Sequence, residues 1–172
     1  MKQLILGGAR SGKSALAQRL AAVTDRDVTY VATATADDDE MAARIAQHQF
    51  DRPSHWSLIE EPVALATVLA QLSGTNQIVL IDCLTLWLSN VLGSNGDISI
   101  VNDFVNAVEQ FNGHLIMVSN EVGQGIVPMG ELSRQFVDET GRLHQLLASC
   151  CDRVVMTVAG IPVIIKGESV EV

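Results

Sequence analysis

The residues with the clearest chemical meaning lie within the first fourteen positions. Gly7 is followed by four residues and then by Gly12, Lys13 and Ser14, in the order GGARSGKS. This spacing predicts a phosphate-binding P-loop, because glycine permits a tight backbone curl and a helix N-terminus adds a positive field. Lys13 is expected to reach the β- and γ-phosphates of a nucleoside triphosphate, and Ser14 to bind Mg²⁺. The predicted nucleotide contacts are Gly7, Gly8, Ala9, Arg10, Ser11, Gly12, Lys13 and Ser14.

A P-loop of this kind usually needs an acidic residue at the end of another strand to help hold the metal ion. Asp82 closes the apolar segment IVLID and fits that role. Glu121, which also follows an apolar segment, is the alternative. A third interpretation is that Asp82 only ends a strand.

A second group of reactive residues lies on the helix predicted over 37–52. Arg44, His48 and Arg52 are four residues apart and share one face of such a helix. The two arginines favour the neutral, nucleophilic form of His48 and offer positive charge to an incoming phosphate. From spacing alone, the favoured interpretation is a solvated basic face, with Met41 and Ile45 packing inward. His55, His114 and His144 are expected to be structural, with His55 the second candidate for a functional contact.

The elements that must position these residues alternate between apolar strands and helices. Strands are predicted over 3–6, 28–32, 56–60, 78–83, 115–119, 154–158 and 162–166, and helices over 13–23, 37–52, 63–72, 84–92, 100–111 and 131–150, the last interrupted by Gly141. Uniformly apolar strands that alternate with helices predict an α/β fold with a mostly parallel sheet covered on both faces. The last two strands predict a hairpin around 159–160.

Composition limits the class of protein. The chain has 172 residues, a length that favours a single domain over 1–172. The net charge of −9 argues against a nucleic-acid binder. No apolar run is long enough to span a bilayer, and the first residues do not resemble a signal peptide, so a cytoplasmic location is expected. Cys83, Cys150 and Cys151 are expected to be reduced rather than disulfide-bonded.

Four segments together resemble one family. They are GGARSGKS at 7–14, DDEMAARIAQHQFDRPSHW at 38–56, LIDC at 80–83 and NEVGQGIVP at 120–128. In this order, across nearly the whole chain, they resemble adenosylcobinamide kinase/adenosylcobinamide-phosphate guanylyltransferase. The second and fourth segments are far more specific than the P-loop, which many families share.

The resemblance implies a bifunctional enzyme of cobalamin synthesis with a RecA-like P-loop fold. Such an enzyme phosphorylates adenosylcobinamide with ATP or GTP, then transfers GMP from GTP to adenosylcobinamide phosphate through a GMP–histidine intermediate. His48 matches the nucleophile, and a homotrimer is implied. Beyond the P-loop, the implied nucleotide contacts are Thr33, Ala34, Thr35, Gln49, Phe50, Asp51, Arg52, Glu60 and Asp82.

Two departures and two competing interpretations accompany the resemblance. Asp82 stands where relatives can carry Glu, and Gln47 stands where a relative can carry His. The alternative enzyme is a simple P-loop kinase of a small metabolite, which needs no nucleophilic histidine. The non-enzyme alternative, a GTP-dependent switch, is disfavoured because the nearest segment to N-K-x-D is Asn120-Glu121-Val122-Gly123.

Overall fold

A computed structural model describes residues 1–35, 52–94 and 97–170 of the chain. Within this part the strands form one seven-stranded sheet in the order β3-β2-β4-β5-β1-β6-β7. The pairs from β3 to β6 are parallel, and β7 pairs with β6 in the antiparallel sense. The strands are β1 Lys2–Gly7, β2 Val28–Ala32, β3 Ser57–Glu60, β4 Ile78–Asp82, β5 His114–Asn120, β6 Arg153–Val158 and β7 Ile161–Lys166.

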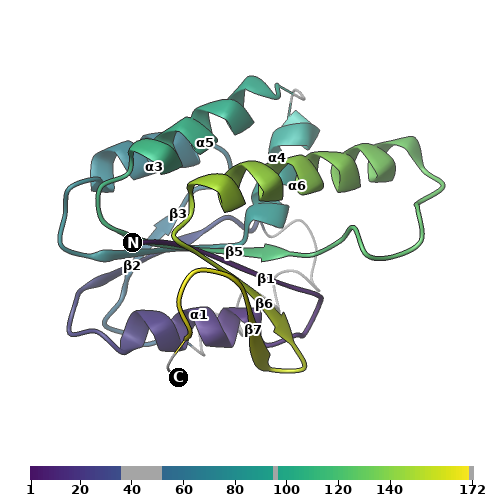
Figure 1. Cartoon of the computed structure of the whole chain (residues 1–172). Helices are drawn as coiled ribbons and strands as arrows, with labels where there is room; N and C mark the ends of the chain where they lie inside the picture. Colours follow the sequence, from purple (N-terminus) through teal and green to yellow (C-terminus); the bar gives the residue numbers. More distant parts are fainter. Residues whose placement is uncertain (36–51, 95–96, 171–172) are drawn as a thin grey trace.

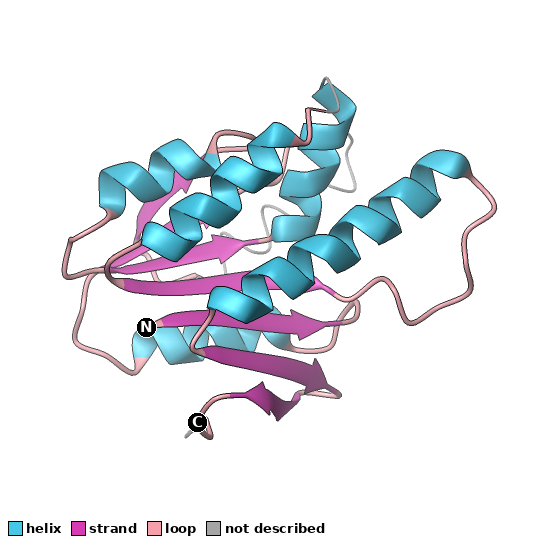
Figure 2. Ribbon diagram, turned by 45° about the horizontal axis from the view of Figure 1, so that its top comes forward, coloured by secondary structure: helices cyan, strands magenta, loops and turns pink. Residues whose placement is uncertain are grey.

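Helices cover both faces of the sheet (Figures 1 and 2). The α1 face is covered by α1, and the opposite α6 face by α3, α4, α5 and α6. In Figure 1 the first half of α6 and the loop before it extend beyond the sheet. The described helices are α1 Lys13–Ala22, α3 Leu65–Leu72, α4 Leu84–Ser94, α5 Ser99–Gln110 and α6 Glu131–Cys150.

Alternation along the strands divides the core into two layers. On β5, Leu115 and Met117 pack into the cluster that also holds Leu143 and Leu147 of α6. Ile116 and Val118 point the other way and pack with Leu16 and Ala17 of α1. Successive side chains of a strand point to opposite faces, so this alternation fixes which polar side chains at the strand ends share a face.

The expected α/β fold is confirmed, with a mostly parallel sheet, helices on both faces and a C-terminal hairpin around Ala159–Gly160. The predicted interruption of the last helix at Gly141 is wrong, because α6 is continuous over Glu131–Cys150. A helical glycine costs only about 1 kcal/mol relative to alanine, and the buried side chains on both sides of it outweigh that cost. These side chains are Thr140, Leu143, His144 and Leu147.

The other described element boundaries lie within two residues of expectation. The helix predicted from residue 63 begins at Leu65, because the Glu61 carboxylate accepts hydrogen bonds from the N–H groups of Val63 and Ala64 and holds them before the first turn. The helix predicted over 37–52 falls outside the described residues except for Arg52, which lies in a bend.

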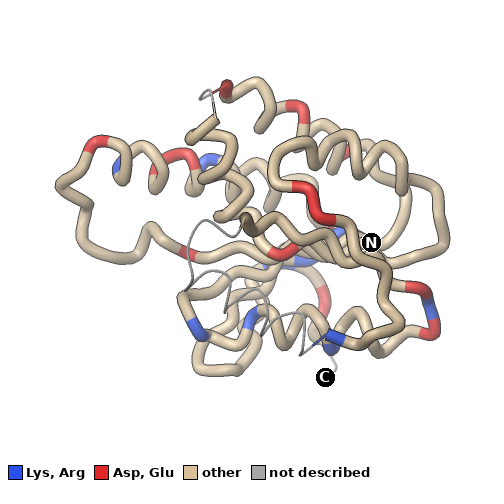
Figure 3. The backbone as a smooth tube through the Cα atoms, turned by 180° about the vertical axis from the view of Figure 1, so that it is seen from behind, with Lys and Arg blue, Asp and Glu red and all other residues tan. Residues whose placement is uncertain are grey.

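The described backbone carries scattered charged residues and three free thiols. Along the described backbone in Figure 3, Lys and Arg stand singly among Asp and Glu. Among the described helices, none combines the length and apolarity needed to cross a bilayer. The three cysteines are free, as expected; Cys83 and Cys151 are buried, and burial raises the pKa of each of these two thiols.

Candidate active site

The P-loop is the turn between β1 and α1. Gly12 has φ 93° and Arg10 has φ 55°, so two residues of the loop take the left-handed conformation that lets the backbone curl. Gly7 is required for a different reason: an added Cβ there would collide with the Ser11 side chain and lie 2.8 Å from the Thr157 carbonyl oxygen. Sequence spacing therefore predicted this loop correctly.

Lys13 is a buried cation at the first turn of α1. Its Nζ donates a hydrogen bond to the Gly8 carbonyl oxygen at 3.1 Å, which holds the ammonium against the loop. The described helix α1 has no acidic residue in its first turn and no side-chain cap at Gly12. Its first N–H groups and the ammonium are thus suited to an anion with several oxygens, such as a phosphate.

Strand register gathers the other predicted residues at the same edge of the sheet. Gly7 is aligned with Asn120 of β5, while Ala32 of β2 is aligned with both Asp82 of β4 and Glu60 of β3. All of these residues end parallel strands. The carboxyl ends of such strands are where ligands bind in open α/β sheets.

Asp82 lies on the α1 face, the face that carries the P-loop helix. Its neighbours along β4 settle this point, because Leu80 packs into the α1 cluster and Ile81 into the other. Burial, followed by the charge and hydrogen bonding of the nearby Asp82 carboxylate, raises the Tyr30 pKa. The Arg52 guanidinium carbon lies 5.1 Å from the centre of the Tyr30 ring. Asp82, Tyr30 and Arg52 therefore form one polar group beside the P-loop.

Thr33 ties the loop after β2 to the loop after β4. Its hydroxyl donates to the Cys83 carbonyl oxygen at 2.7 Å and accepts from the Cys83 N–H at 2.9 Å, and its side chain is fully buried. The Thr33 carbonyl oxygen accepts from Asn90 at 2.9 Å. Thr33 thus fixes the backbone next to Asp82, while Ala34 and Thr35 are half-buried.

Glu121, the alternative metal ligand, points to the α6 face. Its Oε1 accepts from the Gly123 N–H at 2.6 Å, and its Oε2 lies 3.6 Å from Nδ1 of His144. His144 is buried in α6, with Nε2 at 2.8 Å from the Ser119 hydroxyl. Burial lowers the His144 pKa, and Glu121 opposes that effect. Among the two carboxylates, the geometry favours Asp82 for a site shared with the P-loop.

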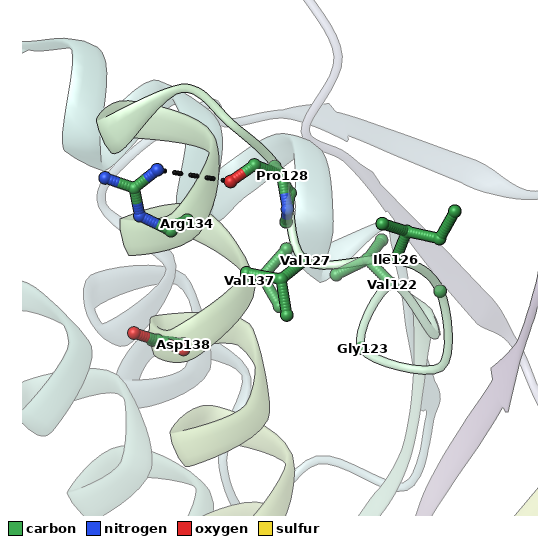
Figure 4. Close-up of a pocket in the computed structure, with 9 residues that line it drawn as sticks. Val122, Gly123, Ile126, Val127, Pro128, Arg134, Val137 and Asp138 are labelled. Carbon is green, nitrogen blue, oxygen red and sulfur yellow. Dashed lines mark hydrogen bonds between the residues drawn. The ribbon is translucent and has the colours of Figure 1, made fainter.

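A small hollow lies in the loop before α6 (Figure 4). Its volume is about 180 Å³, below the 300–1,000 Å³ typical of ligand pockets, and Arg134 closes one side by donating to the Pro128 carbonyl oxygen at 3.2 Å. The hollow contains no P-loop residue, so it is not the phosphate site. It is lined by Val122, Gly123, Gly125, Ile126, Val127, Pro128, Arg134, Val137 and Asp138.

Several predicted residues lie outside the described part of the chain. They are Arg44, His48, Gln49, Phe50 and Asp51. The structure also adds residues that the sequence analysis had not assigned to the site. Tyr30 and Asn120 share the α1 face with Asp82, and only the alternation of side chains along β2 and β5 could have indicated them.

Comparison with known proteins decides between the enzyme classes. Residues 3–165 match the family described as CobU, cobinamide kinase / cobinamide phosphate guanyltransferase. The chain belongs to this family. It is 50% identical over 171 residues to the bifunctional adenosylcobalamin biosynthesis protein CobP of Pseudomonas aeruginosa, covering 98% of this chain and 99% of that one. It is 37% identical over 182 residues to the bifunctional adenosylcobalamin biosynthesis protein CobU of Escherichia coli, covering 96% and 100%.

Solved structures support the fold of this CobU family member. A protein from Pyrococcus horikoshii aligns with a TM-score of 0.55 at 12% identity, covering 98% of this chain and 87% of that one. The RadB recombinase aligns with a TM-score of 0.51 at 15% identity, covering 90% and 72%. These identities bear on the fold alone, and the expected RecA-like P-loop fold is confirmed. The expected enzyme class, a P-loop kinase and guanylyltransferase of cobalamin biosynthesis, is confirmed by the family.

Proposed function

We propose that this chain phosphorylates the hydroxyl group of adenosylcobinamide with ATP or GTP and then transfers GMP from GTP to the resulting phosphate, releasing diphosphate. The observation that carries the proposal is the P-loop with Lys13 and Ser14 beside Asp82, in a chain that matches the family over residues 3–165. The competing proposal is a P-loop kinase of another small metabolite that uses the same three residues.

The phosphoryl step follows from the geometry of the loop. Curled N–H groups and the Lys13 ammonium surround the β- and γ-phosphates, and Lys13 exchanges the Gly8 carbonyl oxygen for phosphate oxygens. The acceptor hydroxyl oxygen forms a bond to the γ-phosphorus while the bond to the β–γ bridging oxygen breaks. Positive charge held in place beside the transferring group stabilises the transition state.

The residues around Asp82 fit a magnesium ion. Mg²⁺ prefers oxygen ligands and keeps several waters, so the Ser14 hydroxyl and the Asp82 carboxylate suffice beside phosphate oxygens. The alternation of side chains along β4 places the carboxylate on the α1 face, which Tyr30 of the neighbouring strand β2 shares. In the described part of the chain no cluster of three or more His, Cys, Asp or Glu residues could hold a metal, which favours a shared protein–nucleotide site over a protein cage. When bound, the ion neutralises charge on the triphosphate.

The guanylyl step assigns the nucleophile to His48. The imidazole nitrogen attacks the α-phosphorus of GTP and diphosphate leaves; the oxygen of the corrinoid phosphate then attacks the same phosphorus and the P–N bond breaks. Arg52 supports this assignment, because it follows His48 by four residues in the chain and its guanidinium lies over Tyr30, on the strand that pairs with β4. We assign further nucleotide contacts to Thr33, Ala34, Thr35, Gln49, Phe50, Asp51, Arg52 and Glu60.

The proposal is tested by incubating the protein with GTP labelled in the α-phosphate and in the guanine ring. Covalent GMP that is acid-labile and base-stable is expected on the wild type and on His55→Ala, but not on His48→Ala. Lys13→Ala is expected to lose phosphoryl transfer to the corrinoid. If the wild type transfers phosphate but never acquires GMP, the simple kinase is the better account. If His48→Ala still acquires GMP, the nucleophile lies elsewhere and His55 is examined first.

We also propose that residues 1–172 act as one P-loop nucleotide-binding domain, that the protein is a homotrimer, and that it works in the cytoplasm. The trimer rests on the family resemblance. Ile126, Met129 and Leu132, which are largely exposed in the loop before α6 and at the start of α6, add support for contacts between copies. Multi-angle light scattering tests the assembly, and a stable monomer at micromolar concentration refutes it.

A further inference from the structure

Three buried polar atoms without a hydrogen-bond partner gather around Gly7. They are Oγ of Ser11, Oδ1 of Asn120 and Oγ1 of Thr157. Asn120 and Thr157 are the register partners of Gly7 on its two neighbouring strands, β5 and β6. A buried acceptor without a partner costs free energy, so such a group at a binding site indicates that a ligand completes it.

Asn120 is the member of this group that lies on the side of β1 nearer to Asp82. Its side chain shares the α1 face with Val118, which packs in the same cluster as Leu16 and Ala17. Strand β5 lies between β1, which ends in the P-loop, and β4, which ends at Asp82. A bound γ-phosphate would lie between the P-loop, which would hold the β-phosphate, and the Asp82 carboxylate, which would hold the metal ion. Asn120 therefore ends β5, the strand that runs beneath that position.

A hydrogen bond holds the Asn120 amide in a defined orientation. Its Nδ2 donates to the Thr85 hydroxyl at 3.2 Å, and that buried hydroxyl lies 3.2 Å from the Cys83 thiol, next to Asp82. With the nitrogen engaged, Oδ1 is left as an acceptor. The oxygens of an ionised γ-phosphate are acceptors too, so they do not satisfy it. The donor that the phosphoryl step brings to this place is the hydroxyl of the substrate that receives the phosphate.

We propose that Asn120 orients the attacking hydroxyl in the phosphoryl step, a role that rests on the proposed function. Oδ1 accepts the hydroxyl hydrogen bond and points an oxygen lone pair at the γ-phosphorus. The new O–P bond forms, the bond to the β–γ bridging oxygen breaks with its electron pair leaving on the nucleoside diphosphate, and the hydroxyl proton passes to a transferred phosphate oxygen and then to water. The α-phosphorus, where GMP transfer occurs, lies two bridges away and does not use this contact.

The test compares Asn120→Ala with Asn102→Ala, which removes the same side chain from an exposed position of α5, outside the site. Asn120→Ala is expected to lower kcat for phosphoryl transfer about 10- to 100-fold, with the nucleotide KM changed less than about threefold. Asn102→Ala is expected to keep kcat within about twofold of wild type. Labelling of His48 by GTP is expected to persist in both variants.

A second assay separates this proposal from the proposed function. Water can replace the substrate hydroxyl, so slow GTP hydrolysis in the absence of corrinoid is expected to fall in Asn120→Ala by a similar factor. If the wild type phosphorylates no corrinoid while Asn120→Ala loses hydrolysis, the proposed function fails and the role of Asn120 stands.

Three results overturn the role of Asn120. One is a kcat and a hydrolysis rate within twofold of wild type in Asn120→Ala. Another is an equal loss of His48 labelling and of binding to a non-hydrolysable GTP analogue, which indicates a structural contribution. The last is full recovery of Asn120→Ala at high Mg²⁺, which assigns Oδ1 to a metal-bound water instead.

Discussion

Replacing Thr33 by valine removes a hydroxyl while keeping nearly the same shape. The Thr33 hydroxyl makes two bonds to the Cys83 backbone, at 2.7 Å to its carbonyl oxygen and 2.9 Å to its N–H. The carbonyl oxygen keeps its bond from the Trp87 N–H at 3.2 Å, whereas the buried Cys83 N–H is left without the threonine oxygen. An unpaired buried N–H costs about 1–3 kcal/mol and the lost second bond about 1 kcal/mol. We therefore expect Thr33→Val to lower the free energy of unfolding by about 2–4 kcal/mol.

Urea unfolding followed by tryptophan fluorescence measures this loss, because Trp56 and Trp87 are both buried. Thr33→Ser is the matched control: it keeps the hydroxyl and removes one methyl group, so about 1 kcal/mol is expected. The active site supplies a second measurement, since the same bonds hold the backbone next to Asp82, and Thr33→Val is expected to weaken nucleotide binding more than Thr33→Ser does. A Thr33→Val loss below about 1 kcal/mol, or an equal loss in both variants, refutes the reasoning.

Three further predictions follow from the same structure. Asp82→Asn is expected to raise the Mg²⁺ concentration needed for half-maximal activity, while Glu121→Gln leaves it unchanged; the opposite pattern in a metal titration moves the ligand to Glu121. In urea unfolding, Gly141→Ala is expected to raise the free energy of unfolding by about 0.5–1 kcal/mol and Gly74→Ala to lower it by about 1–2 kcal/mol. An added Cβ meets open space at both positions, but only Gly74 has a left-handed backbone, with φ 79°. Equal effects of the two substitutions contradict this account. Burial lowers the His144 pKa below its usual 6.5, so the unfolded state binds the proton more readily. The contribution of neutral His144 to the free energy of unfolding is therefore fully present above pH 6.5 and is lost as the pH falls through the folded pKa. Unfolding measured at pH 8 and pH 5.5 should show this pH-dependent loss in the wild type but not in His144→Gln.

Local patterns in the sequence predicted the elements and the phosphate loop well. GGARSGKS, the apolar strands and the final hairpin depend on nearest neighbours in the chain, and the structure confirms each of them. The predicted interruption at Gly141 was wrong because side chains of α6 that pack onto other elements outweigh the free-energy cost of a glycine within a helix. This balance depends on tertiary contacts, which a short stretch of sequence does not reveal.

The composition of the site was predicted only in part. Asp82 follows from its place at the end of an apolar segment, but the choice between Asp82 and Glu121 depends on which face of the sheet each side chain meets. Tyr30 looked like an ordinary strand residue, and its partnership with Asp82 requires β2 and β4 to be neighbours. The order of the strands therefore identified Tyr30 as a neighbour of Asp82, which the residue types alone do not indicate. The role of His48 stays a prediction, because it lies outside the described residues.

The position of β1 has a consequence for the order in which the protein is made. This first strand lies between β5 and β6, and the Lys2 N–H donates to the carboxylate of Asp152, 150 positions later in the chain. On the ribosome, β1 is translated before β5 and β6, so it has no lasting neighbour until β5 emerges, and its second edge stays open until β6 follows. Nucleotide in the cell therefore cannot stabilise the nascent chain during most of its synthesis. The strand that carries the phosphate loop is therefore fully paired only after β6 has been translated.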